Sequence, residues 1–198
     1  MKRENETEGS GRPAAFLDRD GTLTVERGYV TDPCDLELER GAAAAVARLN
    51  AAGVLAVVVS NQSGVARGLM TEDDLAGVHD RLVELLAAGG ATLDGAYYAP
   101  NYPDARVTAL GRDTSWRKPD TGMVEAAVRD LGADLDQSAM FGDQVTDLEL
   151  AARAGIRGVL VRTGRGTSVE RKLTGPVAHV ADDIAGGIEW FLRELELA

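Results

Sequence analysis

Short apolar runs alternate with longer segments of helical periodicity along most of the chain. The runs at 14–17, 54–59, 94–98, 139–141 and 158–161 are predicted strands. The segments 41–52, 71–88, 122–131, 147–154 and 184–197 are predicted helices, with Thr71 as the N-cap of the second. Because apolar strands without an exposed side alternate with helices, the pattern predicts a parallel central sheet covered on both faces, a three-layer α/β/α fold.

This alternation continues to the C-terminus without an interdomain linker or an internal repeat. We therefore expect a single domain over residues 13–198. Residues 1–12 are polar, contain Gly and Ser, and are expected to form a disordered tail. The connections 24–35 and 99–120 are long, and the second exceeds the usual length of a loop, which suggests a function. Neither has room for a large cap domain.

Polar residues follow the apolar segments at positions where open α/β sheets bind their ligands. Asp18 and Asp20 come directly after the first strand, and Ser60 follows the second. Lys118 begins the helix after the long connection, and Asp143 follows the fourth strand. Two neighbouring carboxylates repel each other unless a cation or a shared proton relieves the repulsion. Oxygen ligands of this kind suit Mg²⁺.

Each cluster also has an ordinary structural explanation. An Asp-Gly pair after a strand is a common turn, Ser60 can serve turn chemistry, and Lys118 can be an exposed basic residue. Asp147 is either a carboxylate behind a metal site or an acid in the first turn of a helix, favoured by the helix dipole. The order of the clusters along the chain favours a catalytic site over separate turns.

In that order, the clusters resemble the motifs of haloacid dehalogenase (HAD) superfamily phosphatases. The segments are FLDRDGTL at 16–23, SNQSG at 60–64, RKP at 117–119 and GDQVTD at 142–147. Within the superfamily the chain is similar to the small-capped histidinol-phosphate and heptose bisphosphate phosphatases. The segments RGYV at 27–30, VVVSNQSGVARG at 57–68 and LVRTGRG at 160–166 favour the heptose bisphosphate members. The resemblance implies a Rossmann-like, HAD-type fold with a minimal cap.

The resemblance also implies catalytic roles. Asp18 would be the nucleophile that forms an aspartyl-phosphate, and Asp20 the general acid and base. Asp18, the backbone carbonyl of Asp20, and Asp143 would hold Mg²⁺, with Asp147 behind them. Ser60 and Lys118 would bind the phosphoryl oxygens during the reaction.

Substrate contacts are implied for three segments: Glu26, Arg27, Gly28 and Tyr29; Asn61, Gln62 and Ser63; and Arg117. Arg117 would bind the non-reacting phosphate or a sugar hydroxyl, and the alternative is a surface arginine. The expected reaction, within carbohydrate metabolism, removes the 7-phosphate of D-glycero-D-manno-heptose 1,7-bisphosphate. Histidinol phosphate or another small sugar phosphate is the alternative substrate.

A receiver-like phospho-aspartate signalling module is an alternative of another class, because receivers are also acidic doubly wound domains. Asp20 argues against it, since a receiver has no use for an acid/base two residues after the acceptor aspartate.

The chain departs from its relatives at a loop that binds zinc in many of them. The matching positions hold residues without a thiolate or imidazole, namely Ala99, Asn101, Thr114 and Trp116. We therefore predict no structural zinc and a loop held by packing of Tyr98, Tyr102 and Trp116, unless these rings line the substrate mouth. Gln144 stands where heptose bisphosphate phosphatases often have lysine.

The composition of the chain argues against several classes of binding partner. The formal net charge of −11 argues against nucleic acid, which usually needs a basic stripe. Cys34 is the single cysteine, so no intrachain disulfide can form. The sequence shows neither a membrane-spanning run nor a signal-peptide core, which predicts a cytoplasmic protein without a membrane partner. We expect a monomer whose partner is a small phosphorylated sugar.

Overall fold

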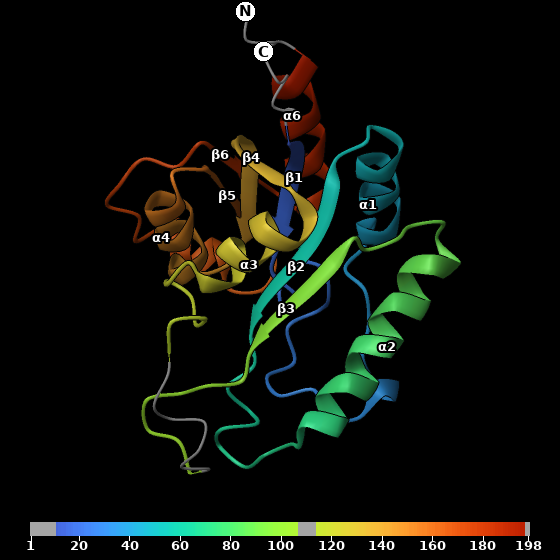
Figure 1. The fold of residues 1–198 in the computed structure, drawn as a ribbon, viewed down its shortest axis with the longest axis vertical. Helices are drawn as coiled ribbons and strands as arrows, with labels where there is room; N and C mark the ends of the chain where they lie inside the picture. The colour runs from blue at the N-terminus through green and yellow to red at the C-terminus, as the bar shows by residue number, and fades with distance from the viewer. Residues whose placement is uncertain (1–10, 107–113, 197–198) are drawn as a thin grey trace, which may run out of the picture.

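Six parallel strands form the central sheet in the computed structural model, which describes residues 11–106 and 114–196 (Figure 1). The strands are β1 (Arg12–Leu17), β2 (Leu55–Asn61), β3 (Gly95–Ala99), β4 (Ala133–Gly142), β5 (Arg157–Val161) and β6 (His179–Ala181). Their order across the sheet is β3-β2-β1-β4-β5-β6. The chain therefore builds outward from β1 to β3 and then returns to the other side of β1 with β4. In sheets of this kind, ligands bind at the carboxyl ends of the strands where the order reverses.

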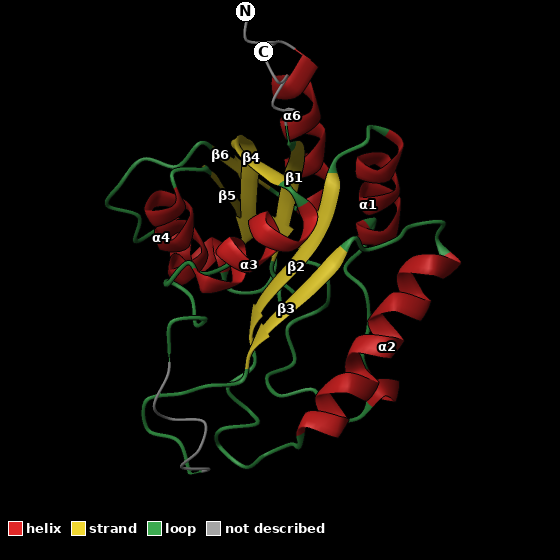
Figure 2. Cartoon of the chain, in the orientation of Figure 1, coloured by secondary structure: helices red, strands yellow, loops and turns green. Residues whose placement is uncertain are grey.

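Helices cover both faces of the sheet (Figure 2). On one face lie α1 (Ala42–Ala51), α2 (Glu72–Ala88) and α6 (Ile184–Glu196), and on the other lie α3 (Gly122–Leu131) and α4 (Val145–Ala154). Two short helices, η1 (Pro33–Asp35) and α5 (Gly166–Glu170), lie in connections. The predicted three-layer α/β/α fold with a parallel sheet is confirmed. None of the helices in the described ranges is long and apolar enough to cross a bilayer.

The strand β1 shows why the strands of this sheet are continuous apolar runs in the sequence. Ala15 and Leu17 pack into the core beneath α1, α2 and α6, whereas Ala14 and Phe16 pack into the core beneath α3 and α4. All four side chains are fully buried. Successive side chains of a strand point to opposite faces, so a strand covered on both sides needs apolar residues at every position.

Several elements extend beyond the range that the sequence pattern predicts. β1 begins at Arg12, inside the expected tail, because the N–H of Arg12 donates to the carbonyl of Gly132 at 3.0 Å. Residues 1–10 of that tail, and Leu197 of the last predicted helix, lie outside the described residues. β4 starts at Ala133 rather than residue 139, and its pairing with β1 shifts register between Pro13 and Ala15.

Local patterns account for two further boundaries. The predicted N-cap Thr71 is confirmed, since its side chain accepts from the N–H of Asp74 and its N–H donates to the Asp74 carboxylate. The pattern does not predict β6, an edge strand of three residues, because so short a run carries no period.

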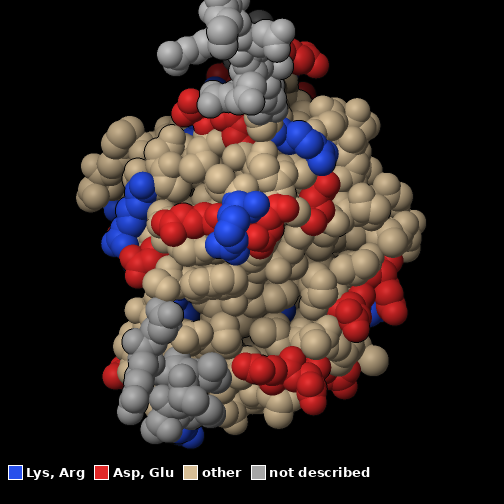
Figure 3. Space-filling view, in the orientation of Figure 1, with Lys and Arg blue, Asp and Glu red and all other residues tan. Residues whose placement is uncertain are grey.

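On the face shown in Figure 3, acidic and basic side chains lie intermixed.

Phe191 anchors α6 to the sheet, and its truncation tests this packing. Its side chain is fully buried and meets Phe141 of β4 edge to face, with 5.7 Å between ring centroids. Phe191→Ala should lower the free energy of unfolding by about 3–5 kcal/mol, because it leaves a cavity in the core. Urea unfolding at an unchanged m value measures this loss. Val83→Ala, on the exposed side of α2, should change it by less than about 0.5 kcal/mol, and equal losses would contradict the assigned packing.

Candidate active site

A pocket of about 310 Å³ opens at the carboxyl ends of β1 and β2. It brings together most of the site residues that the sequence predicts: Asp18, Asp20, Glu26, Gly28, Tyr29, Ser60, Asn61, Gln62, Ser63, Arg117 and Lys118. Asp143 and Asp147 lie next to Asp18 and are fully buried. Arg27 lies outside the lining, where it is half exposed and forms an ion pair with Glu37. Its role in substrate binding stays a prediction.

The pairing of β1 with β4 sets the spacing of two carboxylates. Asp18 follows the last residue of β1, and its N–H donates to the carbonyl of Phe141 in β4 at 2.9 Å. Asp143 follows the last residue of β4. Since adjacent strands of a sheet lie about 4.8 Å apart, two side chains leaving neighbouring strand ends are close to each other.

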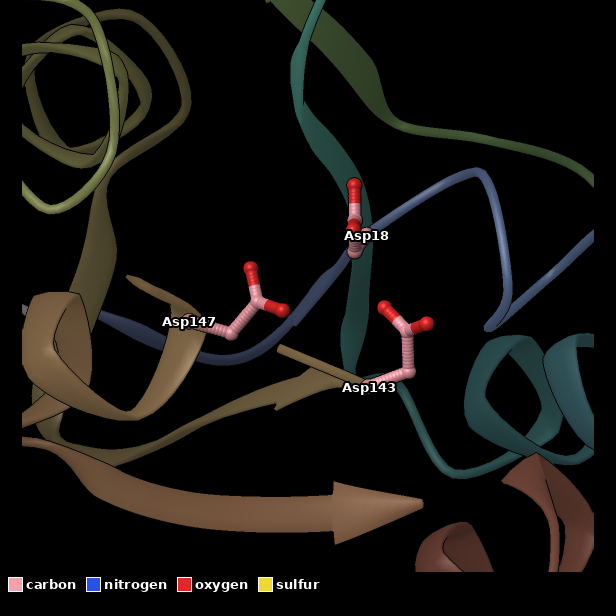
Figure 4. A group of neighbouring side chains, drawn as sticks. All are labelled: Asp18, Asp143 and Asp147. Atoms are coloured by element: carbon pink, nitrogen blue, oxygen red, sulfur yellow. The ribbon is translucent and has the colours of Figure 1, made fainter. Parts of the chain in front are cut away.

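Three carboxylates converge from different elements, as Figure 4 shows: Asp18 after β1, Asp143 after β4 and Asp147 in the first turn of α4. Each offers one oxygen within 4.8 Å of the others. The Oδ1 atom of Asp143 is buried and has no hydrogen-bond donor among the described residues. Burial, and then the charge of Asp18, raise the pKa of Asp143 to about 7. A buried carboxylate oxygen that accepts no hydrogen bond and lies near another carboxylate is suited to a hard divalent cation such as Mg²⁺.

Lys118 supplies the positive charge nearest this cluster. Its ammonium group contacts Asp18 Oδ1 at 2.9 Å, Asp147 Oδ1 at 2.7 Å and the carbonyl of Val59 at 2.9 Å. Burial lowers the pKa of Lys118, but attraction to Asp147 and Asp18 outweighs burial and raises the pKa above its ordinary value. The amide of Asn61 also accepts from the N–H of Lys118 at 2.9 Å and donates to its carbonyl at 3.1 Å. Lys118 is therefore a buried, charged group of the pocket and not an exposed basic turn.

Asp147 lies in the first turn of α4, as one of the two alternatives predicts, and its role behind a metal site stays a prediction. One oxygen pairs with Lys118, and the other accepts from the N–H of Gln144 at 2.9 Å, at the start of α4. That contact begins α4 at Val145, two residues before the predicted start. The same carboxylate thus caps a helix and holds the ammonium beside Asp18.

Two turns close over Asp143, one after β1 and one after β5. The N–H of Arg165 donates to Asp143 Oδ2 at 2.8 Å, and the hydroxyl of Thr163 donates to the carbonyl of Gly21 at 2.7 Å. A Cβ at Gly21, where φ is +82°, or at Gly164, where φ is +53°, would lie 2.3 Å from Asp143 Oδ2. Only glycine permits both turns to approach this carboxylate.

Arg67 and Tyr102 line the pocket together with Arg117. Tyr102 therefore lies where the alternative prediction for the aromatic residues placed it, whereas Arg67 was not predicted. The Tyr102 ring has the Arg67 guanidinium carbon 3.8 Å from its centroid and that of Arg117 at 5.0 Å. Burial, and to a smaller extent the charge of Arg67, lower the pKa of Arg117. Neither arginine forms an ion pair within the described ranges. The signal that could have identified Arg67 is its place in the VVVSNQSGVARG segment.

The three aromatic residues predicted to hold the loop do not pack as one group, and each has different neighbours. Tyr102 lines the pocket, Trp116 packs against Tyr97 at 6.1 Å between centroids, and Tyr98 contacts His79. Residues 107–113 of this loop lie outside the described residues, and the absence of zinc stays a prediction.

Comparisons with known proteins agree with the geometry. Residues 115–186 match the profile of the family described as HAD-hydrolase-like. A D-glycero-D-manno-heptose-1,7-bisphosphate 7-phosphatase of Thermosynechococcus vestitus is 46% identical over 93% of this chain and 97% of its own length. A D-glycero-beta-D-manno-heptose-1,7-bisphosphate 7-phosphatase of Photorhabdus laumondii is 40% identical over 81% of this chain and 86% of its own.

A solved structure extends the match to the fold. The D,D-heptose 1,7-bisphosphate phosphatase of B. bronchiseptica, complexed with magnesium and phosphate, superposes with a TM-score of 0.83 at 33% identity. The match covers 92% of this chain and 99% of that one. The resemblance of the sequence motifs to HAD superfamily phosphatases is confirmed. The chain belongs to the family of HAD phosphatases that includes the D-glycero-D-manno-heptose-1,7-bisphosphate 7-phosphatases.

Proposed function

We propose that the chain removes the 7-phosphate of D-glycero-D-manno-heptose 1,7-bisphosphate with Mg²⁺, through an aspartyl-phosphate on Asp18. The observation that carries this proposal is the buried cluster in which the Asp18 carboxylate contacts the Lys118 ammonium and lies close to Asp143, whose buried Oδ1 has no hydrogen-bond donor among the described residues. Relatives that are 46% and 38% identical bear the name of this activity, which supports the choice of substrate.

The residues present fit Mg²⁺. Asp18, Asp143 and the backbone carbonyl of Asp20 would hold the ion, and the buried Oδ1 of Asp143 lacks another partner in the described part of the chain. Once bound, Mg²⁺ would supply the positive charge that lets a carboxylate approach a phosphate dianion.

The residues of the chain then divide the reaction into two displacements. In the first, Asp18 attacks phosphorus, the bond from phosphorus to the sugar oxygen breaks, and Asp20 gives its proton to that oxygen. In the second, water attacks the phosphoryl group, Asp20 takes a proton from it, and the bond from phosphorus to Asp18 breaks. Inorganic phosphate leaves, and both side chains return to their starting states.

Ser60 and Lys118 would bind the phosphoryl oxygens during these steps. The Ser60 hydroxyl is buried and accepts a hydrogen bond from Gln62 at 3.1 Å, which leaves its own O–H to donate toward the pocket. Lys118 already carries its charge beside Asp18. Donors and charges that are in place before the reaction need no reorganisation as the transition state forms.

The stack of Arg67, Tyr102 and Arg117 at the mouth supports a substrate with two anionic groups. Two guanidinium groups on one ring repel each other unless an anion binds beside them, and a phosphate can accept from both. Histidinol phosphate has no second phosphate, so this observation favours the bisphosphate. Glu26, Gly28, Tyr29, Asn61 and Ser63 complete the proposed sugar-binding wall.

We also propose that the protein is a monomer, works in the cytoplasm, and needs neither nucleic acid nor a membrane. These proposals rest on composition and on the family. We propose as well that the chain from β1 onward, which begins at Arg12 and not at residue 13, forms one domain, and that its 99–116 loop binds no structural zinc.

Asp18→Asn tests the nucleophile. The amide keeps the shape of the side chain but cannot attack phosphorus, so Mg²⁺-dependent release of phosphate from the bisphosphate should fall by about 10⁴-fold or more. Thermal unfolding should still be cooperative. Asp73→Asn, in the exposed first turn of α2, is the matched control and should keep full activity. Metal-dependent turnover by the Asp18→Asn protein would contradict the assignment.

Arg117→Ala tests the second anion site. The loss of a charge-assisted hydrogen bond of roughly 1.5–3 kcal/mol should raise KM for the bisphosphate by about 10- to 100-fold. KM for the heptose 7-monophosphate should change by less than about threefold, since that ester has no second phosphate. Arg48→Ala, on exposed α1, serves as the control. If KM rises equally for both substrates, the residue does not bind the second phosphate.

The raised pKa of Asp143 predicts how Mg²⁺ affinity depends on pH. With a pKa of about 7 in the metal-free protein, Asp143 becomes protonated as the pH falls below 7, and Mg²⁺ needs the ionised carboxylate. Affinity should therefore weaken, approaching tenfold per pH unit on the acidic side, with about one proton released per ion bound. Calorimetric titrations in buffers of different ionisation enthalpy measure both quantities. An affinity that stays constant across this range would show that Asp143 does not titrate there.

A further inference from the structure

We infer that Arg19 and Gln62 are positioning residues that hold the carboxylate of Asp20 in one orientation and thereby control both of its proton transfers. The inference rests on the proposed function, because it takes Asp20 as the acid/base. It moves Gln62 from the substrate contacts, where the sequence resemblance places it, to a role inside the protein.

Arg19 grips Asp20 with two parallel hydrogen bonds. Its Nε donates to Asp20 Oδ1 at 3.0 Å, and its Nη2 donates to Asp20 Oδ2 at 2.9 Å. The Arg19 side chain is only 1% exposed, whereas that of Asp20 is 17% exposed and lines the pocket. Burial lowers the pKa of Arg19, but the charge and hydrogen bonds of Asp20, together with the charges of Tyr98 and Asp18, outweigh burial and raise the pKa. A buried guanidinium is costly unless it is paired, so this fork makes one orientation of Asp20 strongly preferred.

Gln62, the residue after β2, also holds Asp20. Its Nε2 donates to Asp20 Oδ2 at 2.8 Å and to the hydroxyl of Ser60 at 3.1 Å, and its Oε1 accepts from Arg19 Nη2 at 2.9 Å. Because arginine can only donate, the carbonyl end of the amide must face Arg19 and the NH₂ end must face Asp20. Both N–H groups of Gln62 are thus used inside the protein, and its side chain is 4% exposed.

Arg19 in turn packs against Tyr98, which contacts His79. The Arg19 guanidinium carbon lies 6.0 Å from the centroid of the Tyr98 ring, and the Tyr98 hydroxyl is 2.9 Å from Nδ1 of His79 in α2. Burial raises the pKa of Tyr98 to about 12, so its phenol stays neutral. Asp20 is therefore held directly by Arg19 and Gln62, and Tyr98 of β3 and His79 of α2 lie behind Arg19.

This arrangement matters because proton transfer needs an acid or base within hydrogen-bond reach of the reacting oxygen. Without Gln62, Asp20 Oδ2 loses one of its two donors and Arg19 Nη2 loses an acceptor, so the carboxylate of Asp20 is held less firmly in its orientation. Both displacements use Asp20, so the rate of each should fall whenever that displacement requires a proton transfer. The rate of a step that needs no proton transfer should stay unchanged.

Gln62→Met tests this separation of steps, since methionine has a similar length and no hydrogen-bonding amide. p-Nitrophenyl phosphate has a leaving group that departs without a proton, so the first displacement appears as a rapid release of nitrophenolate. The burst rate should stay within about twofold of the unmodified protein, while steady-state turnover falls about tenfold or more. With the heptose bisphosphate, the first displacement itself should slow about tenfold or more at little change in KM.

Gln62→Glu is a second variant for the case in which methionine disrupts folding. It keeps an acceptor for Arg19 and removes the donor to Asp20, and it should separate the steps in the same way. Ser138→Ala is the matched structural control. Ser138 is also fully buried and accepts from the N–H of Ala14 at 2.9 Å, at the other end of the sheet. This control should lower thermal stability but change both steps by the same factor.

Two results would overturn the inference. Equal loss of burst and steady-state rates in both Gln62 variants would show that the residue only stabilises the fold. Unchanged nitrophenyl phosphate kinetics with a raised KM for the bisphosphate would show that it contacts the sugar. Failure of the unmodified protein to hydrolyse either ester with Mg²⁺ would overturn the proposed function itself.

Discussion

The buried ammonium of Lys118 between Asp18 and Asp147 is the interaction on which the rest of the site depends. Three carboxylates meet where the strand order reverses, and Lys118 contacts two of them. Without that charge, their mutual repulsion in a buried setting would force protonation or movement. One ammonium against three carboxylates still leaves a deficit of positive charge, and a divalent cation matches it. Coulomb's law thus explains why a buried lysine lies beside a cluster of carboxylates that is suited to a divalent cation.

The floor and the mouth of the pocket are built from different parts of the fold. The floor uses residues that leave strand ends, where backbone pairing holds them in place, as for Asp18 opposite Phe141. The mouth uses residues from connections, such as Arg67 and Tyr102. Strand ends are rigid and suit reacting groups, whereas connections vary more easily and suit the choice of substrate. The chemistry can therefore stay constant while the substrate changes within such a fold.

The fold itself could be predicted because its signals are local. A strand buried on both faces must be apolar throughout, and Thr71 with Asp74 forms a cap within one helical turn. The ends of elements were less predictable. Arg12 joins β1 through a bond to Gly132, far along the chain, and no local pattern indicates that bond. The three-residue β6 is formed by pairing with β5 and is too short to show a period.

The sequence by itself determined the carboxylates and the serine of the site, because Asp18, Ser60 and Asp143 each stand at the end of an apolar segment and these ends lie at the same edge of a parallel sheet. Lys118 was indicated by its motif instead, because it follows a long connection. Only the tertiary structure decided what those groups touch. The bond from Thr163 to Gly21 spans 142 residues, and Gln62 points to Asp20, 42 residues away. Such contacts depend on the side-chain rotamers and on the packing of distant segments, which residue order does not encode locally. Hydrophobic periodicity is a property of neighbours in the chain, whereas the orientation of a carboxylate is a property of neighbours in space.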